Sequence, residues 1–192
     1  MTITPTTSDD DLLRRMRAGD AQAFAALYRR HQGPVYRFAL LRCGSADTAA
    51  DAVQETFMSL LSGRLAFDPL RGSLQNFLFG VARLLLLKQE APRRRESPLL
   101  DTDDDEDSET AGEEACPLTR VLASEAAEDV RRALARLAPH YRDAVILYEM
   151  HDLSYGEIAT ICAIDIGTVR SRLARGRAAL AKALRAHALD TH

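Results

Sequence analysis

A run of cations near the C-terminus could neutralise phosphate groups. Six basic residues and no acidic residue occur between Ile166 and Arg185. Lys and Arg side chains bind nucleic-acid phosphates, and side chains at the N-terminal end of a helix can reach base edges in the major groove. A basic helix face is about as often plain solvated surface, so the run alone leaves both interpretations open.

The residues before this run predict a helix-turn-helix that would position it. Ser154 and Glu157 have the spacing of a capping box, which starts a helix by satisfying free backbone N–H groups. A short turn at 162–164 leads to Asp165, a suitable N-cap for a second helix from Ile166 onward. The core spacing of the motif is met by Ile158, Ala159, Ile164, Val169 and Leu173.

With these signals added, DNA binding becomes the favoured interpretation of the basic helix. Its candidate contacts face away from Val169 and Leu173 or flank them. They are Gly167, Thr168, Arg170, Ser171, Arg172 and Arg175.

A second set of polar residues shares one face of a helix predicted over 48–61. Asp51, Gln54 and Glu55 lie with Met58 opposite the apolar side at helical spacing. Every amphipathic helix has such a polar face, so spacing alone favours a solvated surface over a partner site.

Covalent and metal chemistry find no support in the sequence. It contains no nucleophile–base pair or carboxylate dyad, and its five histidines lack metal-ligand spacing. Cys43, Cys116 and Cys162 are odd in number, widely spaced and form no C-x-x-C pair, which argues against a disulfide framework or a zinc site. We therefore expect no enzyme, no metal and no cofactor, in a reducing, cytoplasmic compartment.

No segment has the pattern of a membrane span or a secretory signal. The longest apolar run, Leu84 to Leu87, is far shorter than the roughly 20 residues of a spanning helix. Residues 1–11 are polar and acidic, unlike a signal peptide. We expect no membrane insertion, and we interpret the four leucines as core.

The composition predicts an all-α fold. The 192 residues include 31 Ala and 27 Leu but only 13 Ile and Val together, which favours helix over strand. In the first half, helices are expected to follow Ser8 or Asp9, Asp20, Ser45 or Asp47, and Ser73. Gly33-Pro34 is expected to interrupt the second helix and Pro92 to end the fourth, and Pro139 is expected to end a helix of the second half. The apolar stripe predicted for the fourth helix is Leu74, Phe77, Leu78, Val81, Ala82 and Leu85.

The net charge of −3 is unevenly distributed. Residues 96–116 hold ten acids and no base, with few large apolar residues, which predicts disorder. Residues 1–95 hold 14 bases and 9 acids, and residues 117–192 hold 11 bases and 9 acids. The predicted organisation is two mildly basic helical domains, 1–95 and 120–192, joined by a flexible acidic linker over 96–119.

Two groups of motifs then define a family resemblance. In the first half, D-A-V-Q-E-T-F at 51–57 is followed by F-D-P at 67–69 and R-G-S at 71–73. In the second half, L-S-Y at 153–155 leads to G-T-V-R-S-R-L-A-R-G-R at 167–177. Together, in this order, they resemble the extracytoplasmic-function (ECF) sigma factors, the small two-domain type of bacterial RNA polymerase sigma subunit.

The resemblance implies a role for the polar face at 51–57. In the family, this helix docks on a coiled coil of the polymerase β′ subunit. The implied contacts are Asp51, Gln54 and Glu55, and Phe57 would support them from the core side.

The resemblance also implies two DNA sites. In the family, the loop between the third and fourth helices captures an unstacked base of the minus-ten promoter element, and the fourth helix follows the strand backbone. The implied minus-ten residues are Arg64, Arg71, Ser73, Asn76, Arg83 and Lys88. The C-terminal helix-turn-helix reads the minus-thirty-five element and meets the polymerase β flap. An anti-sigma factor usually holds such proteins inactive, often with the two lobes packed around it.

The chain departs from the family pattern at several positions. The fourth helix of the family commonly has Ala-Arg-Asn with an Asp four residues beyond the Asn, and Leu84 and Lys88 take the places of the Asn and the Asp. Phe77 replaces a common Trp. In the helix-turn-helix, Gly156 takes a position that is often Glu, and Ala163 takes the usual turn Gly, which predicts a left-handed backbone there.

Two alternatives stay open at this point. A sigma-like decoy would bind an anti-sigma factor without starting transcription. A plain helix-turn-helix regulator would act on duplex DNA alone and would have no use for the 51–57 motif. The acidic linker, in turn, would either imitate the phosphates of nascent RNA in the polymerase or serve as a solubilising spacer.

Overall fold

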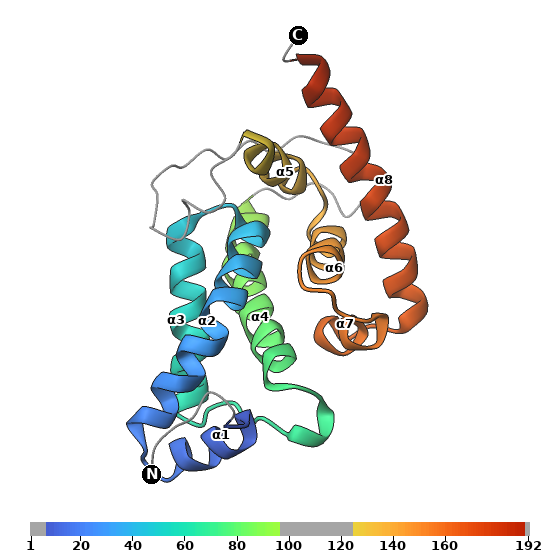
Figure 1. The fold of residues 1–192 in the computed structure, drawn as a ribbon. Coiled ribbons are helices and arrows are strands. Elements are labelled where there is room, and N and C mark those ends of the chain that lie inside the picture. Colours follow the sequence, from blue (N-terminus) through green and yellow to red (C-terminus); the bar gives the residue numbers. More distant parts are fainter. Residues whose placement is uncertain (1–6, 97–124, 191–192) are drawn as a thin grey trace.

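The computed structural model describes residues 7–96, the N-terminal lobe, and residues 125–190, the C-terminal lobe (Figure 1). The N-terminal lobe consists of α1 (Asp9–Arg17), α2 (Ala21–Cys43), α3 (Ala46–Leu61), the 3-10 turn η1 (Pro69–Arg71) and α4 (Leu74–Glu96). The C-terminal lobe consists of α5 (Glu125–Ala135), α6 (Pro139–Glu149), α7 (Tyr155–Cys162) and α8 (Ile166–Asp190). These two ranges contain no strand, which confirms the all-α prediction. Apart from Glu96, the predicted linker lies outside the described residues.

Short polar side chains start the N-terminal helices. Ser8 and Asp20 accept hydrogen bonds from backbone N–H groups in the first turns of α1 and α2. The Ser45 hydroxyl accepts the N–H of Thr48 at 3.3 Å, so Ser45 rather than Asp47 caps α3. Each such cap contributes about 1 kcal/mol to helix stability.

The predicted interruption at Gly33-Pro34 is wrong, because α2 runs continuously through it. Pro34 removes one backbone hydrogen-bond donor from the helix. Packing of the residues before and after the proline compensates for this loss. Leu27 and Phe38, on either side of the proline, are both 0% exposed. The predicted stop at Pro92 is also wrong, since α4 continues to Glu96.

In the N-terminal lobe, α2 is the central helix and packs against α1, α3 and α4. Tyr28 on α2 meets Phe57 on α3 edge to face, with ring centroids 4.9 Å apart. This geometry is among the favoured arrangements of aromatic pairs. It fixes α3 against α2 and leaves the opposite side of α3 facing solvent.

The predicted apolar stripe of α4 is only partly correct. Phe79 and Leu86 are buried although the stripe omits them, whereas Phe77 and Leu85 are half-buried. Phe79 is covered by Phe38 of α2 and by His151 of the other lobe, and Leu86 packs with residues of α2 and α3. The interpretation of all four consecutive leucines as core is wrong for Leu84, which is 63% exposed.

The C-terminal lobe contains the predicted helix-turn-helix, formed by α7 and α8. Ser154 and Glu157 make the complete capping box, and the backbone N–H of Ser154 donates to the Glu157 carboxylate at 2.9 Å. Ala163 is left-handed, as predicted, with φ 55 and ψ 48. Asp165 accepts the backbone N–H of Thr168 at 2.8 Å and so starts α8.

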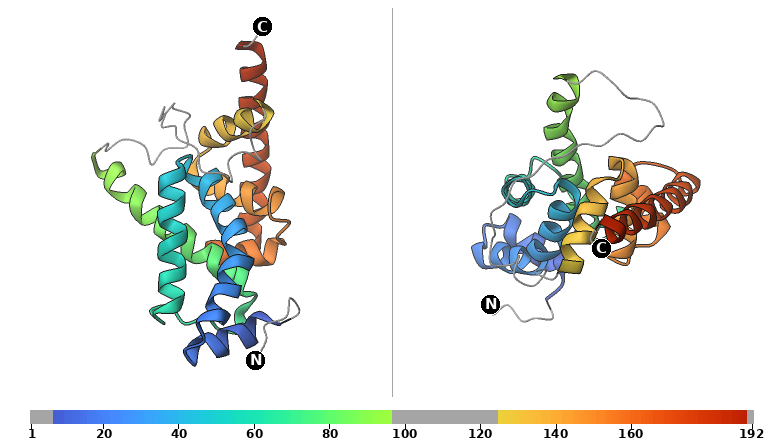
Figure 2. Two further views of the ribbon diagram at one scale, coloured as in Figure 1. Left: turned by 60° about the vertical axis from the view of Figure 1, so that its left-hand side comes forward. Right: turned by 90° about the horizontal axis from the view of Figure 1, so that it is seen from above.

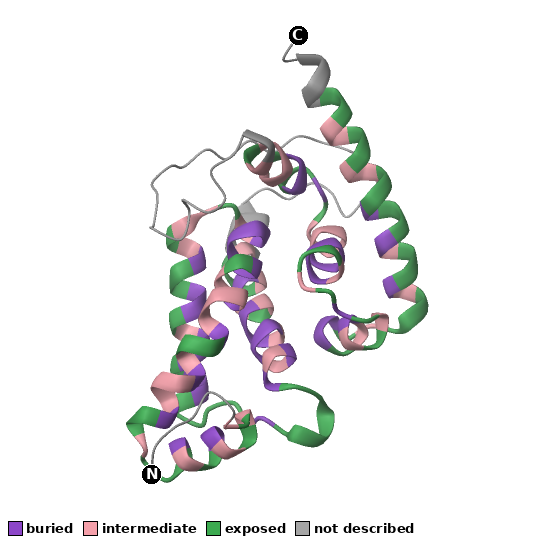
Figure 3. Cartoon of the chain, in the orientation of Figure 1, coloured by how far each residue is buried: buried purple, intermediate pink, exposed green. Residues whose placement is uncertain are grey.

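The long helix α8 packs closely on α6. Gly176 allows this approach, because a Cβ atom there would lie 2.7 Å from Cγ2 of Val145. Figure 3 shows that the buried positions of α8 are confined to the side facing the rest of its lobe. Pro139 is the first residue of α6. Because α5 already ends at Ala135, Pro139 starts the second of these helices and does not itself end the first.

The two lobes pack against each other (Figure 2). Helices α5 and α6 contact α2, α7 contacts α4, and buried residues of both lobes form one continuous core. His151, between α6 and α7, packs on Phe38 and Phe79, with its ring centroid 4.6 Å from that of Phe79. Burial at this interface, helped by the nearby charge of Arg37, lowers the pKa of His151 to about 4.

Candidate functional site

The solvent side of α3 brings the predicted polymerase-binding residues together. Asp51 and Gln54 are exposed and Glu55 is half-buried. Phe57 is 2% exposed and points to the core, where it packs against α2. The face is therefore polar on its outer side and anchored by an aromatic side chain on its inner side.

Two apolar side chains extend this face toward the end of α3. Met58 is 44% exposed and Leu61 is 46% exposed. Sequence reasoning placed Met58 on this face and missed Leu61, although its position three residues after Met58 is the available signal. At the same end, Arg64 Nη1 donates to Glu55 Oε1 at 3.2 Å. One predicted DNA contact is thus paired with one predicted polymerase contact.

Four of the predicted minus-ten residues are exposed to solvent: Arg64, Arg71, Ser73 and Lys88. The Ser73 hydroxyl also accepts the backbone N–H of Asn76 at 3.2 Å, which caps α4 as predicted. The loop before α4 thus carries two exposed arginines, Arg64 and Arg71, and ends at the capped start of α4.

The other two predicted minus-ten residues contact the C-terminal lobe instead. Asn76 Nδ2 donates to Oε1 of Glu157 at 2.9 Å, and Arg83 Nε donates to Oδ2 of Asp143 at 2.7 Å. The Asn76 hydrogen bond, followed by those from Ser154, holds the pKa of Glu157 below its ordinary value. Both α4 side chains are therefore engaged by carboxylates from the other lobe.

The predicted minus-thirty-five residues lie together on the first three turns of α8. Those exposed to solvent are Gly167, Arg170, Ser171 and Arg175, and those half-buried are Thr168 and Arg172. Val169 and Leu173, on the opposite side, are 0% and 1% exposed and hold the helix on its lobe.

Asp165, which the sequence predicted only as an N-cap, also contacts a predicted DNA-binding residue at this end of α8. Asp165 accepts the Thr168 hydroxyl at 2.6 Å as well as its backbone N–H. These two hydrogen bonds, the hydroxyl foremost, lower the pKa of Asp165. The Thr168 hydroxyl donates its proton to this cap, so it can only accept from a further ligand.

A buried group of charges joins the lobes, and we call it the inter-lobe cluster: Arg42, Arg83, Glu90 and Asp143. Arg42 and Asp143 are 0% and 1% exposed. Arg42 Nη2 donates to Oε2 of Glu90 at 2.9 Å. Arg42 Nε also forms an ion pair with Asp143 Oδ1, but the two atoms do not have the geometry of a hydrogen bond. Although burial opposes its charge, Glu90 and Asp143 together raise the pKa of Arg42.

Sequence reasoning missed this cluster. The available signal is a charge inside an apolar run, since Arg42 follows Phe38-Ala39-Leu40-Leu41 and Asp143 precedes Ala144-Val145-Ile146-Leu147. A fully buried charge requires a partner, but the sequence does not say which one.

Comparison with known proteins assigns each lobe to a known protein family. Residues 27–96 match sigma-70 region 2, and residues 127–180 match sigma-70 region 4. The chain is 33% identical over 180 residues to the ECF RNA polymerase sigma factor SigM of Mycobacterium tuberculosis, covering 92% of this chain and 85% of that protein.

The chain belongs to the ECF RNA polymerase sigma factors.

Two further relatives agree with this assignment. ECF RNA polymerase sigma factor SigE of Mycolicibacterium smegmatis is 32% identical over 165 residues, covering 86% of this chain and 63% of SigE, so the chain spans less than two thirds of that relative. The co-crystal structure of the sigma factor RpoE with the anti-sigma factor NepR from Bartonella quintana is similar with a TM-score of 0.67 and 28% identity. That match covers 86% of this chain and 98% of the RpoE chain.

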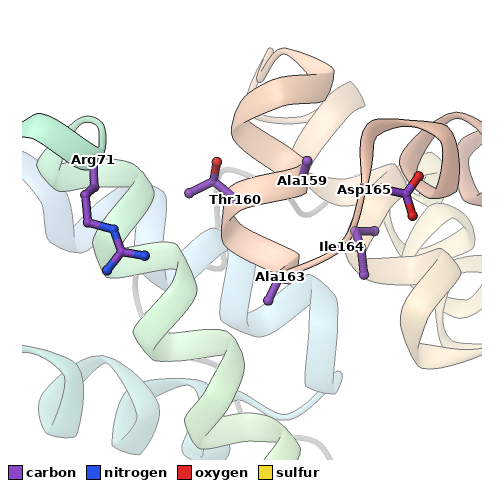
Figure 4. Close-up of a pocket in the computed structure, with 6 residues that line it drawn as sticks. All are labelled: Arg71, Ala159, Thr160, Ala163, Ile164 and Asp165. Carbon is purple, nitrogen blue, oxygen red and sulfur yellow. The ribbon is translucent and has the colours of Figure 1, made fainter.

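In this sigma factor, an open cleft separates the loop before α4 from the helix-turn-helix (Figure 4). Its volume is about 780 Å³. Arg71 lines one side, and Thr160, Ala163, Ile164 and Asp165 line the other. One predicted minus-ten residue thus faces the turn between α7 and α8.

The described part of this sigma factor offers no metal site, since no three potential ligands of the His, Cys, Asp and Glu types gather in it. Burial raises the pKa of the Cys162 thiol to about 11, which disfavours the reactive thiolate. Among the same residues, no helix is both long and apolar enough to cross a membrane.

Proposed function

We propose that this sigma factor is a promoter-specificity subunit that binds core RNA polymerase and promoter DNA while the polymerase performs the chemistry. The α3 face would bind the β′ coiled coil, the loop before α4 and α4 itself would bind the minus-ten element, and α8 would bind the minus-thirty-five element. The β flap would contact the C-terminal helix-turn-helix.

The observation that carries this proposal is the arrangement of α3. Asp51, Gln54 and Glu55 share its outer side, and Phe57 is fixed in the core behind them. A regulator that acts on duplex DNA alone has no need of this motif. The arrangement of α3 therefore favours a polymerase subunit over a plain helix-turn-helix regulator.

Run-off transcription with purified core polymerase tests the proposal. The wild-type chain should start transcripts from genomic promoters. Gln54→Ala should weaken core binding about tenfold, because it removes a central polar contact worth about 1.4 kcal/mol. Gln22→Ala, which alters an exposed glutamine on α2, is the matched control and should bind like the wild type. If the wild-type chain binds an anti-sigma factor but starts no transcript, it is a decoy instead.

The DNA role of α8 has its own test within the same helix. Arg175→Ala should weaken the footprint over the minus-thirty-five element and reduce the salt dependence of binding by about one phosphate contact. Arg185→Ala removes an exposed arginine three turns later and should leave the footprint unchanged. Equal footprints from both variants would remove Arg175 from the site.

The domain limits and the linker remain part of this proposal. We take 1–95 and 120–192 as the domains and 96–119 as the linker, and limited proteolysis should cut first within the linker. Replacing its ten acids with Ser and Gln tests whether they imitate RNA. Altered open-complex formation or abortive synthesis would support imitation, and unchanged values would leave the spacer role.

An anti-sigma partner is proposed from the RpoE–NepR co-crystal structure described above. A protein that co-purifies with this chain qualifies as that partner if it blocks run-off transcription in proportion to its concentration.

A further inference from the structure

Leu70 is the most exposed of the large apolar side chains in the described part of the chain. It is 95% exposed in the η1 turn, whereas Leu84 is 63% exposed and Leu65 is 42% exposed (Figure 3). A single apolar side chain on a surface is common and by itself indicates nothing. Leu70 differs in two respects, because its backbone is held in a defined conformation and because arginines flank it.

Hydrogen bonds and special residues hold the backbone of the η1 turn. The Asp68 carboxylate accepts the backbone N–H of Leu70 at 3.0 Å, and the Asp68 carbonyl accepts that of Arg71 at 3.1 Å. Pro69, the first residue of the turn, has its φ fixed by its ring. Gly72 ends the turn with a φ of 133°, which glycine adopts readily. The turn therefore presents Leu70 from a defined backbone.

The loop that carries η1 is anchored to two helices. Phe67 is 7% exposed, and its ring meets that of Phe77 on α4 edge to face, with centroids 5.5 Å apart. Arg17 Nη2 of α1 donates to the carbonyl oxygen of Phe67 at 3.4 Å. Ser73 caps α4 directly after the turn. Turning Leu70 into the core would require these anchors to shift, so its apolar surface is available to a partner.

The charge around Leu70 favours nucleic acid as that partner. Arg71 follows it directly and Arg64 lies earlier in the same loop, and both arginines are exposed. Asp68 is the one acid among residues 62–73, and its carboxylate is engaged in capping η1. Arginines neutralise phosphates, and proteins that unstack DNA insert apolar side chains such as leucine between neighbouring bases.

We propose that Leu70 is a wedge that inserts between neighbouring bases of the minus-ten element and so assists strand separation. This inference rests on the proposed function of the loop before α4, and it assigns one step to one side chain. Taking a base out of the stack costs stacking energy. Leucine surface placed against the remaining base replaces part of that contact. The wedge acts while the strands separate, so DNA that is already open does not need it.

Leu70→Ala tests the wedge in holoenzyme assembled from core polymerase and the full chain. The template is a promoter from which the wild-type chain starts run-off transcripts, with 2-aminopurine in the non-template strand of the minus-ten element. The fluorescence of 2-aminopurine rises when the base unstacks, so its time course gives the opening rate. That rate should fall about tenfold, which corresponds to about 1.4 kcal/mol of activation free energy. Leu70→Met keeps a long apolar side chain and should open the promoter at close to the wild-type rate.

Two controls isolate strand separation. On a template whose minus-ten element is already open through mismatched bases, Leu70→Ala should initiate like the wild type. Met150→Ala shortens another exposed apolar side chain, which is 38% exposed in the other lobe, and should behave like the wild type on both templates. Because Leu70 is so exposed, its truncation leaves the core intact, and circular dichroism together with a core-binding measurement verifies this.

The outcomes separate the wedge from the proposed function. A wild-type opening rate for Leu70→Ala overturns the wedge, and so do equal losses from Leu70→Ala and Leu70→Met. A deficit of Leu70→Ala that persists on the pre-opened template also overturns it, because Leu70 then acts in a step other than strand separation. Failure of the wild-type chain to initiate on either template overturns the proposed function itself, which no result with the Leu70 variants alone would do.

Discussion

Replacing Gly176 by alanine should destabilise the C-terminal lobe, although alanine is the better helix former. The new Cβ would lie 2.7 Å from Val145 Cγ2 and 3.3 Å from the Tyr141 carbonyl oxygen. Favourable carbon contacts lie at about 3.5–4.0 Å, so the overlap with Val145 is about 1 Å. Val145 is 0% exposed and β-branched, so it cannot rotate away into solvent.

The expected change in the free energy of unfolding is the difference between two opposing effects. Overpacking a core costs about 1–3 kcal/mol, and alanine gains about 1 kcal/mol over glycine within a helix. The net loss is about 1 kcal/mol, and for a chain of this size the Tm should fall by about 2–4 °C. Thermal unfolding followed by circular dichroism measures the change, and urea unfolding checks it at constant temperature.

Gly80→Ala is the control for this prediction. Gly80 is also within a helix, α4, but a Cβ there would have no atom within 4 Å. This variant should gain about 0.5–1 kcal/mol from helix propensity alone. If Gly176→Ala raises the Tm as Gly80→Ala does, the close packing of α8 on α6 is not the constraint described above.

Three further variants test other parts of the structure. Ala163→Gly should raise the free energy of unfolding by about 0.5–1 kcal/mol, because it relieves a left-handed alanine at φ 55; equal urea midpoints would argue against strain. Ser154→Ala should lower that free energy by about 1 kcal/mol through loss of the capping box, and an unaltered midpoint would contradict this role. His151→Phe should reduce the acid sensitivity of folding. The pKa of His151 falls from 6.5 to about 4 in the folded state, so its contribution is complete above pH 6.5 and is lost as the pH falls toward 4. Urea unfolding above and within that window measures the difference, and equal pH dependence in both proteins would refute it.

Local signals in the sequence were enough to predict the helix-turn-helix. The capping box at Ser154 and Glu157, the left-handed turn at Ala163 and the N-cap at Asp165 all occur as expected. Each depends on residues a few positions apart, whose preferences act within a single turn of chain. The same holds for the α3 face, because its helical spacing alone determines which residues share a side.

Features that depend on distant contacts were not predictable in this way. The continuous α2 depends on packing around Pro34 that outweighs one lost hydrogen bond. The burial of Phe79 depends on Phe38 of α2 and on His151 of the other lobe, and Leu86 packs with residues of α2 and α3. The partners of Arg42 come from α4 and α6, and no spacing rule connects those helices.

Because both lobes belong to one chain, the contacts between them respond to protein concentration differently from contacts between two separate proteins. Residues 97–124 join the two lobes in one chain, so the contacts between the lobes are intramolecular and do not weaken when the protein is diluted. Tethered partners meet at an effective concentration that reaches the millimolar range for short linkers. A ligand that competes for Arg83 or Asn76 must overcome this local concentration of Asp143 and Glu157, whatever the number of sigma molecules in the cell.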